Sequence, residues 1–265
     1  MTATGSRIQI KPLTRHIGAE LVGIDLQNGL DDALPTLRAA LLGYQVVIVR
    51  DQFLEPGRLR DVADVFGTVQ TRPGRTTIST DGHADVLTVI TPDGTASPDQ
   101  FHFDGAFDEE PPAASLLSMV ETPEVGGDLL CSSGAATYEA LSGPMQSLVD
   151  ELRVAYAFEG PDRPPRAAEH PLVLSHPETG RRCLRFDGVN AVRIIGLNPN
   201  ESNALLTFLR SHVAEPTFVC RHWWHAGDFV MWDNRSTMHR AACDYSERRV
   251  IYRVSVVGDL AAARP

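Results

Sequence analysis

Short β-like runs in the C-terminal third are the feature that most limits the folds open to this chain. TFVCRHWW, DFVMWD and RVIYRVSVV are rich in β-branched and aromatic residues, and turn-forming segments separate them. An earlier apolar run, QVVIVR, predicts a buried strand. Many short strands with a few helices favour an α+β protein, in which helices surround a β-sandwich or barrel.

Four segments with helical patterns lie between these runs. The first lies near residues 34–42, the second begins at Pro56, and the third spans 133–152 with a break at its Gly-Pro pair. The fourth has Asn198 as its expected N-cap and Pro199 at its first helical position. These segments supply the helices that are expected around the strands.

The sequence contains no marker of a domain boundary. No linker, repeat or low-complexity tract divides the 265 residues, and a chain of this length can bury a substantial core. One domain spanning residues 1–265 is therefore expected. Within it, the polar, proline-rich stretch EGPDRPPRAAEHP at 159–171 predicts an irregular loop.

Composition and charge exclude several classes of function. The net charge of −10 argues against a nucleic-acid partner, because phosphate binding needs a basic surface. No run approaches the roughly 18 apolar residues of a membrane span, and the N-terminus lacks an apolar signal core. We therefore expect a cytoplasmic protein without a membrane partner. The four cysteines form no CxxC pair, which favours reduced thiols over disulfides or a zinc site.

The stretch QFHFDGAF, residues 100–107, places two polar side chains among phenylalanines. On an extended segment His102 and Asp104 point to one face, while the phenylalanines point to the other. An unpaired carboxylate near aromatic rings is costly, so a metal ion is a natural partner. A second His-x-Asp match, at His83 and Asp85, lies at the polar entrance to a strand and is interpreted as a solvated turn.

A third metal-competent side chain follows the turn-forming segment WDNRS. His239 together with His102 and Asp104 makes a set of two histidines and one carboxylate. Three such ligands on one face leave positions open, as in non-haem iron(II) oxygenases. A structural zinc site favours four ligands with more thiolate. The remaining histidines, among them His170 and His176, lie in polar or proline-adjacent stretches and are predicted at the surface.

Two arginines in RVIYRVSVV carry a further prediction. Arg249 and Arg253 are four residues apart in a strand-like run, so both side chains project to one face with Ile251 between them. Inward-facing guanidinium groups need anionic partners. The pair therefore predicts two carboxylate-like ligands, each suited to a guanidinium fork.

Several collinear motifs together resemble one known family. IGAELVGIDL, QVVIVRDQ, the His-x-Asp segment, GGD followed by SSGAATYEALS, and WDNRSTMHRA occur in this order along nearly the whole chain. The chain is similar in these motifs to the TauD/TfdA (taurine dioxygenase / chlorophenoxyacetate dioxygenase) family of Fe(II)- and 2-oxoglutarate-dependent enzymes. The resemblance implies a double-stranded β-helix (jelly-roll) core with flanking helices.

The resemblance also implies an activity and a set of site residues. The activity is O2-dependent hydroxylation of a small organic substrate, with cleavage or desaturation as variants and with succinate and CO2 as co-products. The implied iron ligands are His102, Asp104 and His239. Arg249 is implied to hold the distal carboxylate of 2-oxoglutarate, and Arg253 to hold an anionic group of the substrate.

This chain departs from the taurine enzyme at two positions that matter for binding. Leu129 follows GGD where that enzyme has a threonine that helps to hold 2-oxoglutarate, so Arg249 binds alone or needs another helper. Arg72 stands where that enzyme has a substrate-contacting histidine. The expected substrate is therefore a small anion other than taurine, held by Arg253 with Arg72, Arg75 and Asn190 as candidate helpers.

Two other classes of function remain open at this stage, as does homo-oligomer formation. A metal-dependent hydrolase could use the same three ligands to activate water, although it would not require two arginines in tandem. A non-catalytic jelly-roll binding protein could keep the fold, although it would have no reason to keep the three ligands.

Overall fold

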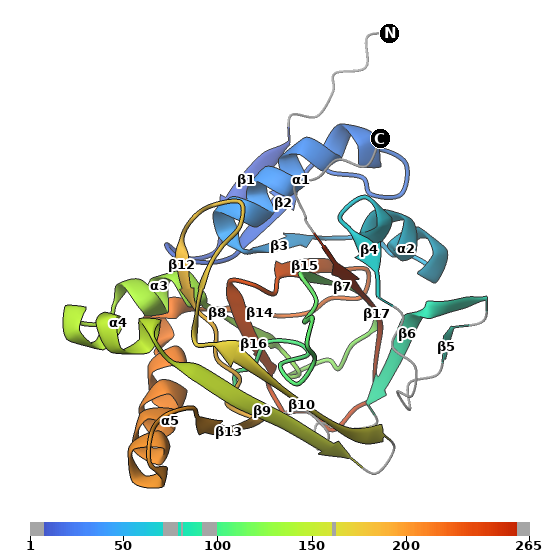
Figure 1. Ribbon diagram of the computed structural model, residues 1–265. Coiled ribbons are helices and arrows are strands. Elements are labelled where there is room, and N and C mark those ends of the chain that lie inside the picture. Colours follow the sequence, from blue (N-terminus) through green and yellow to red (C-terminus); the bar gives the residue numbers. More distant parts are fainter. Residues whose placement is uncertain (1–7, 71–78, 81, 92–99, 161–162, 259–265) are drawn as a thin grey trace, which may run out of the picture.

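The computed structural model describes residues 8–70, 79–80, 82–91, 100–160 and 163–258. Figure 1 shows the strands gathered at the centre, with α1 and α2 along one side and α3, α4 and α5 along another. The helices of the described residues are α1 (Leu30–Tyr44), α2 (Pro56–Asp64), α3 (Gly134–Glu139), α4 (Gly143–Asp150) and α5 (Pro199–Val213), and a short 3-10 helix covers Pro216–Phe218.

The largest sheet within the described residues has nine strands. Its hydrogen-bonded order is β1-β2-β3-β15-β7-β17-β6-β5, and β4 pairs with β17 beside this path. Adjacent strands are antiparallel except β2 and β3, which are parallel. The strands are β1 (Gln9–Pro12), β2 (Ala19–Val22), β3 (Val46–Val49), β4 (Thr68–Val69), β5 (Ser79–Thr80), β6 (His83–Thr91), β7 (Ala114–Glu121), β15 (Phe229–Asp233) and β17 (Arg249–Val257).

Smaller sheets complete the described β-structure. Their orders are β14-β8-β16, β10-β9-β13 and β11-β12. The strands are β8 (Leu129–Ser133), β9 (Arg153–Gly160), β10 (Arg163–Pro171), β11 (Val173–Ser175), β12 (Arg182–Leu184), β13 (Ala191–Ile194), β14 (Val219–His222) and β16 (Thr237–Ala241).

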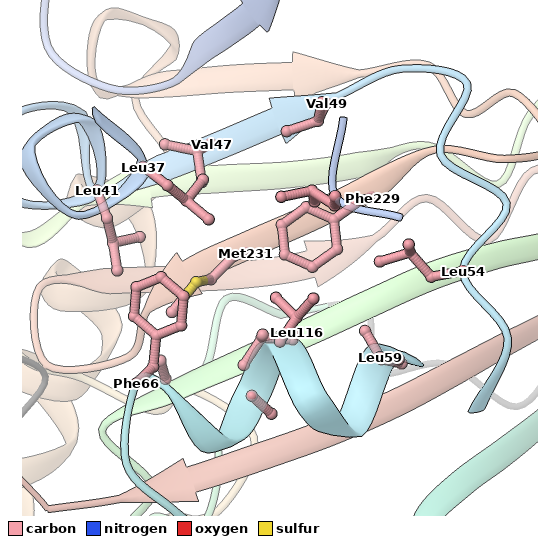
Figure 2. Packing of buried hydrophobic residues seen from close by; sticks show 14 of the residues in the cluster. Leu37, Leu41, Val47, Val49, Leu54, Leu59, Phe66, Leu116, Phe229 and Met231 are labelled. Carbon is pink, nitrogen blue, oxygen red and sulfur yellow. The ribbon is translucent and has the colours of Figure 1, made fainter. Parts of the chain in front are cut away.

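Side chains of β15 alternate between two apolar layers. Phe229 and Met231 pack among side chains of α1 and α2, as Figure 2 shows. Val230 and Trp232 belong to a different cluster, which includes Leu129 of β8 in the small sheet. Because successive strand residues point to opposite faces, the large sheet is covered by helices on one face and by the β14-β8-β16 sheet on the other. These two packed sheets form the predicted jelly-roll core with flanking helices.

The helix predictions are confirmed, and the loop prediction at 159–171 is wrong. A capping box begins α5: the Asn198 side chain accepts from the backbone N–H of Glu201, whose carboxylate accepts from the Asn198 N–H. Residues 163–171 form β10, which pairs antiparallel with β9. The strand tolerates its prolines because the ladder is irregular between Arg163 and Arg166.

The helices and the cysteines bear on two expectations drawn from the composition. None of their helices is long and apolar enough to cross a membrane. Cys131, Cys183 and Cys220 are buried, and Cys243 is exposed.

Candidate active site

A short antiparallel bridge joins two of the predicted metal ligands. The backbone N–H of His102 donates to the carbonyl of His239 over 3.0 Å, and the reverse bond measures 2.8 Å. The two imidazole centroids lie 4.4 Å apart. Phe101 and Phe103 are buried instead in the cluster that includes side chains of α5. The alternation that the sequence predicts for residues 101–104 is therefore present.

Asp104 completes a compact group of ligand atoms. One potential ligand atom from each of His102, Asp104 and His239 lies within 4.8 Å of the others, and no other such group of three was found in the described part of the chain. Asp104 and His239 are buried, and His102 is half-buried. The structure thus brings His239 together with His102 and Asp104, which precede it by more than 130 residues, and all three line one pocket.

The protonation of the imidazoles suits metal binding. Nδ1 of His102 lies 3.1 Å from the carbonyl oxygen of Gln100, which can only accept, so Nδ1 is the donor and Nε2 is the candidate ligand atom. Burial lowers the pKa of His239 to about 3 against the opposing effect of Asp104, which keeps this ring neutral. Nε2 of His239 lies 3.7 Å from Oδ1 of Asp104.

The carboxylate of Asp104 is held in its ionised form. Burial alone would raise its pKa, but the Arg253 guanidinium brings it well below its usual range. Oδ2 accepts a hydrogen bond of 2.7 Å from the Ser115 hydroxyl and pairs with Arg253. Oδ1 faces His239. Two imidazoles and one anionic oxygen are a donor set that fits a divalent iron ion with open coordination positions.

Asn234 fixes the backbone on which Asp104 sits. It is fully buried in the turn between β15 and β16. Its Oδ1 accepts from the N–H of Asp104 over 2.8 Å, and its Nδ2 donates to the carbonyls of Asp104 and Pro112 over 3.1 and 2.8 Å. The segment WDNRS therefore does more than form a turn, because its asparagine ties the turn that precedes His239 to the segment that carries Asp104.

Asn234→Ala is expected to weaken divalent metal binding roughly 10- to 100-fold, the usual cost of losing a partner that orients a metal ligand. The change also leaves buried backbone groups without partners, so the free energy of unfolding should fall by about 1–3 kcal/mol. Titration with Mn(II) and urea unfolding measure the two effects. Asn28→Ala, at an exposed asparagine that bonds Asp25, is the control. An unchanged metal affinity in folded Asn234→Ala protein would contradict this role.

Arg249 is a buried cation that finds no counter-ion among the described residues. Its Nη1 donates to the carbonyl of Gly127 over 2.9 Å, and its buried Nε has no partner. No carboxylate of the described residues forms an ion pair with it. Burial lowers the pKa of its guanidinium, and the Tyr245 ring lies 5.3 Å from the guanidinium carbon. Such a group is costly to bury, which indicates that it is kept for an anion from outside the chain.

Arg253 differs from Arg249 because the protein already supplies it with an anion. Its Nη2 contacts Oδ2 of Asp104 and lies 3.3 Å from the Ser115 hydroxyl. Its Nε is buried and has no partner. The prediction that this guanidinium needs an external anion is therefore only partly supported. Its Nη2 already has a protein anion, while its Nε remains as a donor for a ligand.

The predicted residues meet in one cavity of about 210 Å³. All three triad residues and both arginines line it, with Ile251 between the arginines as the sequence predicts. The other described lining side chains are mostly apolar, with Thr91 offering a hydroxyl and Trp224 and Trp232 offering indole N–H groups that have no partner. The apolar ones are Val89, Leu117, Leu129 and Ala241.

The remaining sequence-predicted contacts are placed elsewhere. Asn190 is not among the cavity-lining residues; its Nδ2 donates to the Asp187 carboxylate over 2.7 Å, which stabilises the turn before β13. Arg72 and Arg75 lie outside the described residues. The second His-x-Asp match takes no part in the site, but its interpretation as a solvated turn is wrong. Both residues lie in β6, and the half-buried Asp85 carboxylate pairs with half-buried Arg60.

Two histidines that the sequence predicts at the surface are buried. His176 Nε2 lies 2.9 Å from the carboxylate of Asp233, the residue before Asn234. His170 Nε2 lies 2.9 Å from the backbone carbonyl of Asp108. Their loop-like sequence context carries no sign of these long-range partners. The roles of Ser115, Asn234 and Thr91 in the site were not predicted either, because their partners also lie far away in the sequence.

A jelly-roll core with two histidines, one carboxylate and a buried arginine around a single cavity defines the class of Fe(II)- and 2-oxoglutarate-dependent dioxygenases. Comparison with known proteins agrees. The sequence profile described as "Taurine catabolism dioxygenase TauD, TfdA family" matches residues 9–255. The chain belongs to this family.

Individual relatives cover nearly the whole chain. An alpha-ketoglutarate-dependent sulfate ester dioxygenase from Pseudomonas putida is 32% identical over 96% of this chain and 90% of its own length. A solved taurine dioxygenase from Burkholderia xenovorans superposes with a TM-score of 0.86 at 39% identity, covering 96% of this chain and 90% of that one. A solved AAD-2 complex with Mn(II) and N-oxalylglycine superposes with a TM-score of 0.81 at 26% identity, covering 96% and 98%.

Proposed function

We propose that this dioxygenase hydroxylates a small anionic organic substrate, with Fe(II) held by His102, Asp104 and His239. The observation that carries the proposal is the combination, in one cavity, of this ligand set with Arg249, a buried cation that has no carboxylate partner among the described residues. Arg249 would bind the distal carboxylate of 2-oxoglutarate through a charge-assisted fork.

The chain's own residues bind and orient the reactants. Bound Fe(II) supplies the activation of O2, coupled to decarboxylation of 2-oxoglutarate to succinate and CO2. His102, His239 and the ionised Asp104 would hold the ion, and three protein ligands would leave coordination positions open for 2-oxoglutarate and O2. The apolar wall and two buried tryptophans, Trp224 and Trp232, limit the access of water.

Arg253 is proposed to select the anionic group of the substrate. Arg253 lines the same cavity as the ligand set, and its guanidinium keeps an unpartnered Nε, so an anion bound to this side chain would be held beside the reaction centre. Relatives that act on sulfate esters support this substrate class. Hydroxylation of the carbon next to the ester oxygen would give an unstable hemiacetal sulfate, which collapses to an aldehyde and sulfate.

An alkyl sulfate ester is expected to stimulate succinate formation more than the alcohol of the same chain length, and Arg253→Ala should remove this preference. Loss of a buried charge-assisted contact costs on the order of 2 kcal/mol or more, or at least about 30-fold in kcat/KM. Arg248→Ala, at an exposed arginine that pairs with Glu121, is the matched control. Fe(II) affinity is measured in parallel, because Arg253 also contacts Asp104.

The products separate the proposal from its rivals. The dioxygenase forms aldehyde and succinate in equal amounts, whereas a hydrolase forms the alcohol and consumes no 2-oxoglutarate. A binding protein forms neither product. Equal use of ester and alcohol by the parent, or a preference that survives Arg253→Ala, would overturn the assignment of the substrate anion to Arg253.

A further inference from the structure

Thr91 supplies the only hydroxyl among the described residues that line the cavity. Leu129 from β8 and Val89 from β6 also line the cavity, and the indole N–H groups of Trp224 and Trp232 are its other neutral side-chain donors. A carboxylate held by one guanidinium fork still has lone pairs that need donors, and aliphatic side chains such as Leu129 and Val89 cannot provide them. Whether the Thr91 hydroxyl can bond the carboxylate that Arg249 binds depends on where it lies relative to Arg249.

Thr91 is the direct cross-strand partner of Arg249. In the antiparallel pairing of β6 with β17, the two residues lie opposite each other in register. Directly opposed residues put their side chains on the same face, with Cβ atoms about 4.5–5.5 Å apart. The two side chains therefore lie side by side on neighbouring strands, and both residues line the same cavity.

Tyr245 contacts both members of this pair. Its hydroxyl lies 2.9 Å from Oγ1 of Thr91, and its ring lies 5.3 Å from the guanidinium carbon of Arg249. The ring also packs closely on Gly127, where an added Cβ would lie 3.1 Å from a ring carbon. The carbonyl of the same glycine accepts from Arg249. Tyr245 is thus a buried support for both groups, although it does not itself line the cavity.

We propose that Thr91 donates a hydrogen bond to the distal carboxylate of 2-oxoglutarate beside Arg249, and that Tyr245 positions Thr91 for this role. The inference rests on the proposed function, in which Arg249 binds that carboxylate. When the Tyr245 hydroxyl donates to Oγ1, the hydrogen of Thr91 is free to point at the ligand. Thr91 then provides the hydroxyl that Leu129 cannot.

The test is calorimetric titration of the Mn(II)-loaded protein with two ligands under anaerobic conditions. One ligand is 2-oxoglutarate, and the other is 2-oxopentanoate, which has the same chain length with a methyl group in place of the distal carboxylate. Thr91→Val should weaken 2-oxoglutarate binding roughly 10- to 100-fold, the usual loss for a hydrogen bond to a charged group. Binding of 2-oxopentanoate should stay within about twofold of the parent value.

Further variants separate a positioning role from general damage to the fold. Thr91→Ser keeps the hydroxyl and should bind 2-oxoglutarate nearly as the parent does. Tyr245→Phe keeps the ring against Arg249 but removes the hydrogen bond to Thr91. Its affinity for 2-oxoglutarate should therefore fall less than that of Thr91→Val, and its affinity for 2-oxopentanoate should not fall. Thr207→Val is the matched control, at an exposed threonine on α5 that bonds only within its helix.

The outcomes distinguish this inference from the function on which it depends. Equal affinity of the parent and Thr91→Val for 2-oxoglutarate overturns the role of Thr91 and leaves the proposed function intact. Equal losses for both ligands overturn it too, because they show a general disturbance of the cavity. A parent protein that does not prefer 2-oxoglutarate over 2-oxopentanoate overturns both the inference and the assignment of Arg249.

Discussion

His239→Ala is expected to abolish 2-oxoglutarate-dependent turnover, and His102→Ala should do the same. Either change leaves two of the three ligand side chains within the group at the cavity. The loss of metal affinity should exceed the roughly 10- to 100-fold that follows loss of an outer hydrogen-bond partner. Equilibrium dialysis with Fe(II) measures the affinity, and succinate formation measures the turnover.

The fold should survive both substitutions. The bridge between the two residues is made by backbone atoms, which alanine retains. The thermal midpoint should therefore stay close to that of the metal-free parent. His16→Ala, at a half-buried histidine outside the cavity, is the control. Parental rates of succinate formation in either folded cavity variant would show that the ligand set lies elsewhere.

Arg249→Met should weaken 2-oxoglutarate binding by about 2–5 kcal/mol, which corresponds to roughly 30- to 4,000-fold. The same change should leave the ligand-free protein as stable as the parent or more stable. Arg249 has no carboxylate partner among the described residues, and its burial lowers the pKa of its guanidinium, so removing the charge relieves an uncompensated desolvation cost.

Urea unfolding with and without 2-oxoglutarate, in the presence of Mn(II), measures both effects. Bound cosubstrate stabilises the parent by mass action, and this gain should disappear in Arg249→Met. Arg248→Ala should keep it, because Arg248 lies at the surface next to Glu121. A variant that loses stability without ligand but keeps the gain from 2-oxoglutarate would show that Arg249 is structural.

The parts of the site that depend on local periodicity could be predicted from the sequence. His102 and Asp104 share a face because they are two residues apart, and Arg249 and Arg253 share one because they are four apart on a strand. The α5 cap was equally local, since Asn198 and Glu201 lie within one helical turn.

The parts that depend on distant partners could not be predicted in this way. Arg253 faces Asp104 only because β17 brings it beside the bridge segment, so its internal carboxylate partner was missed. Thr91 meets Arg249 through the register of β6 on β17, and no single segment encodes that register. Residues 163–171 form a strand despite their prolines because β9 offers a partner edge.

The bridge between His102 and His239 also has a consequence for the order in which the protein matures. The two ligands come from distant parts of the chain, and closing so long a loop is an entropic cost that the assembled sheets must offset. During synthesis, a growing chain that ends before β16 has only His102 and Asp104 available. Iron capture must therefore follow translation of the last third of the protein, so loading with metal reports on the completion of folding.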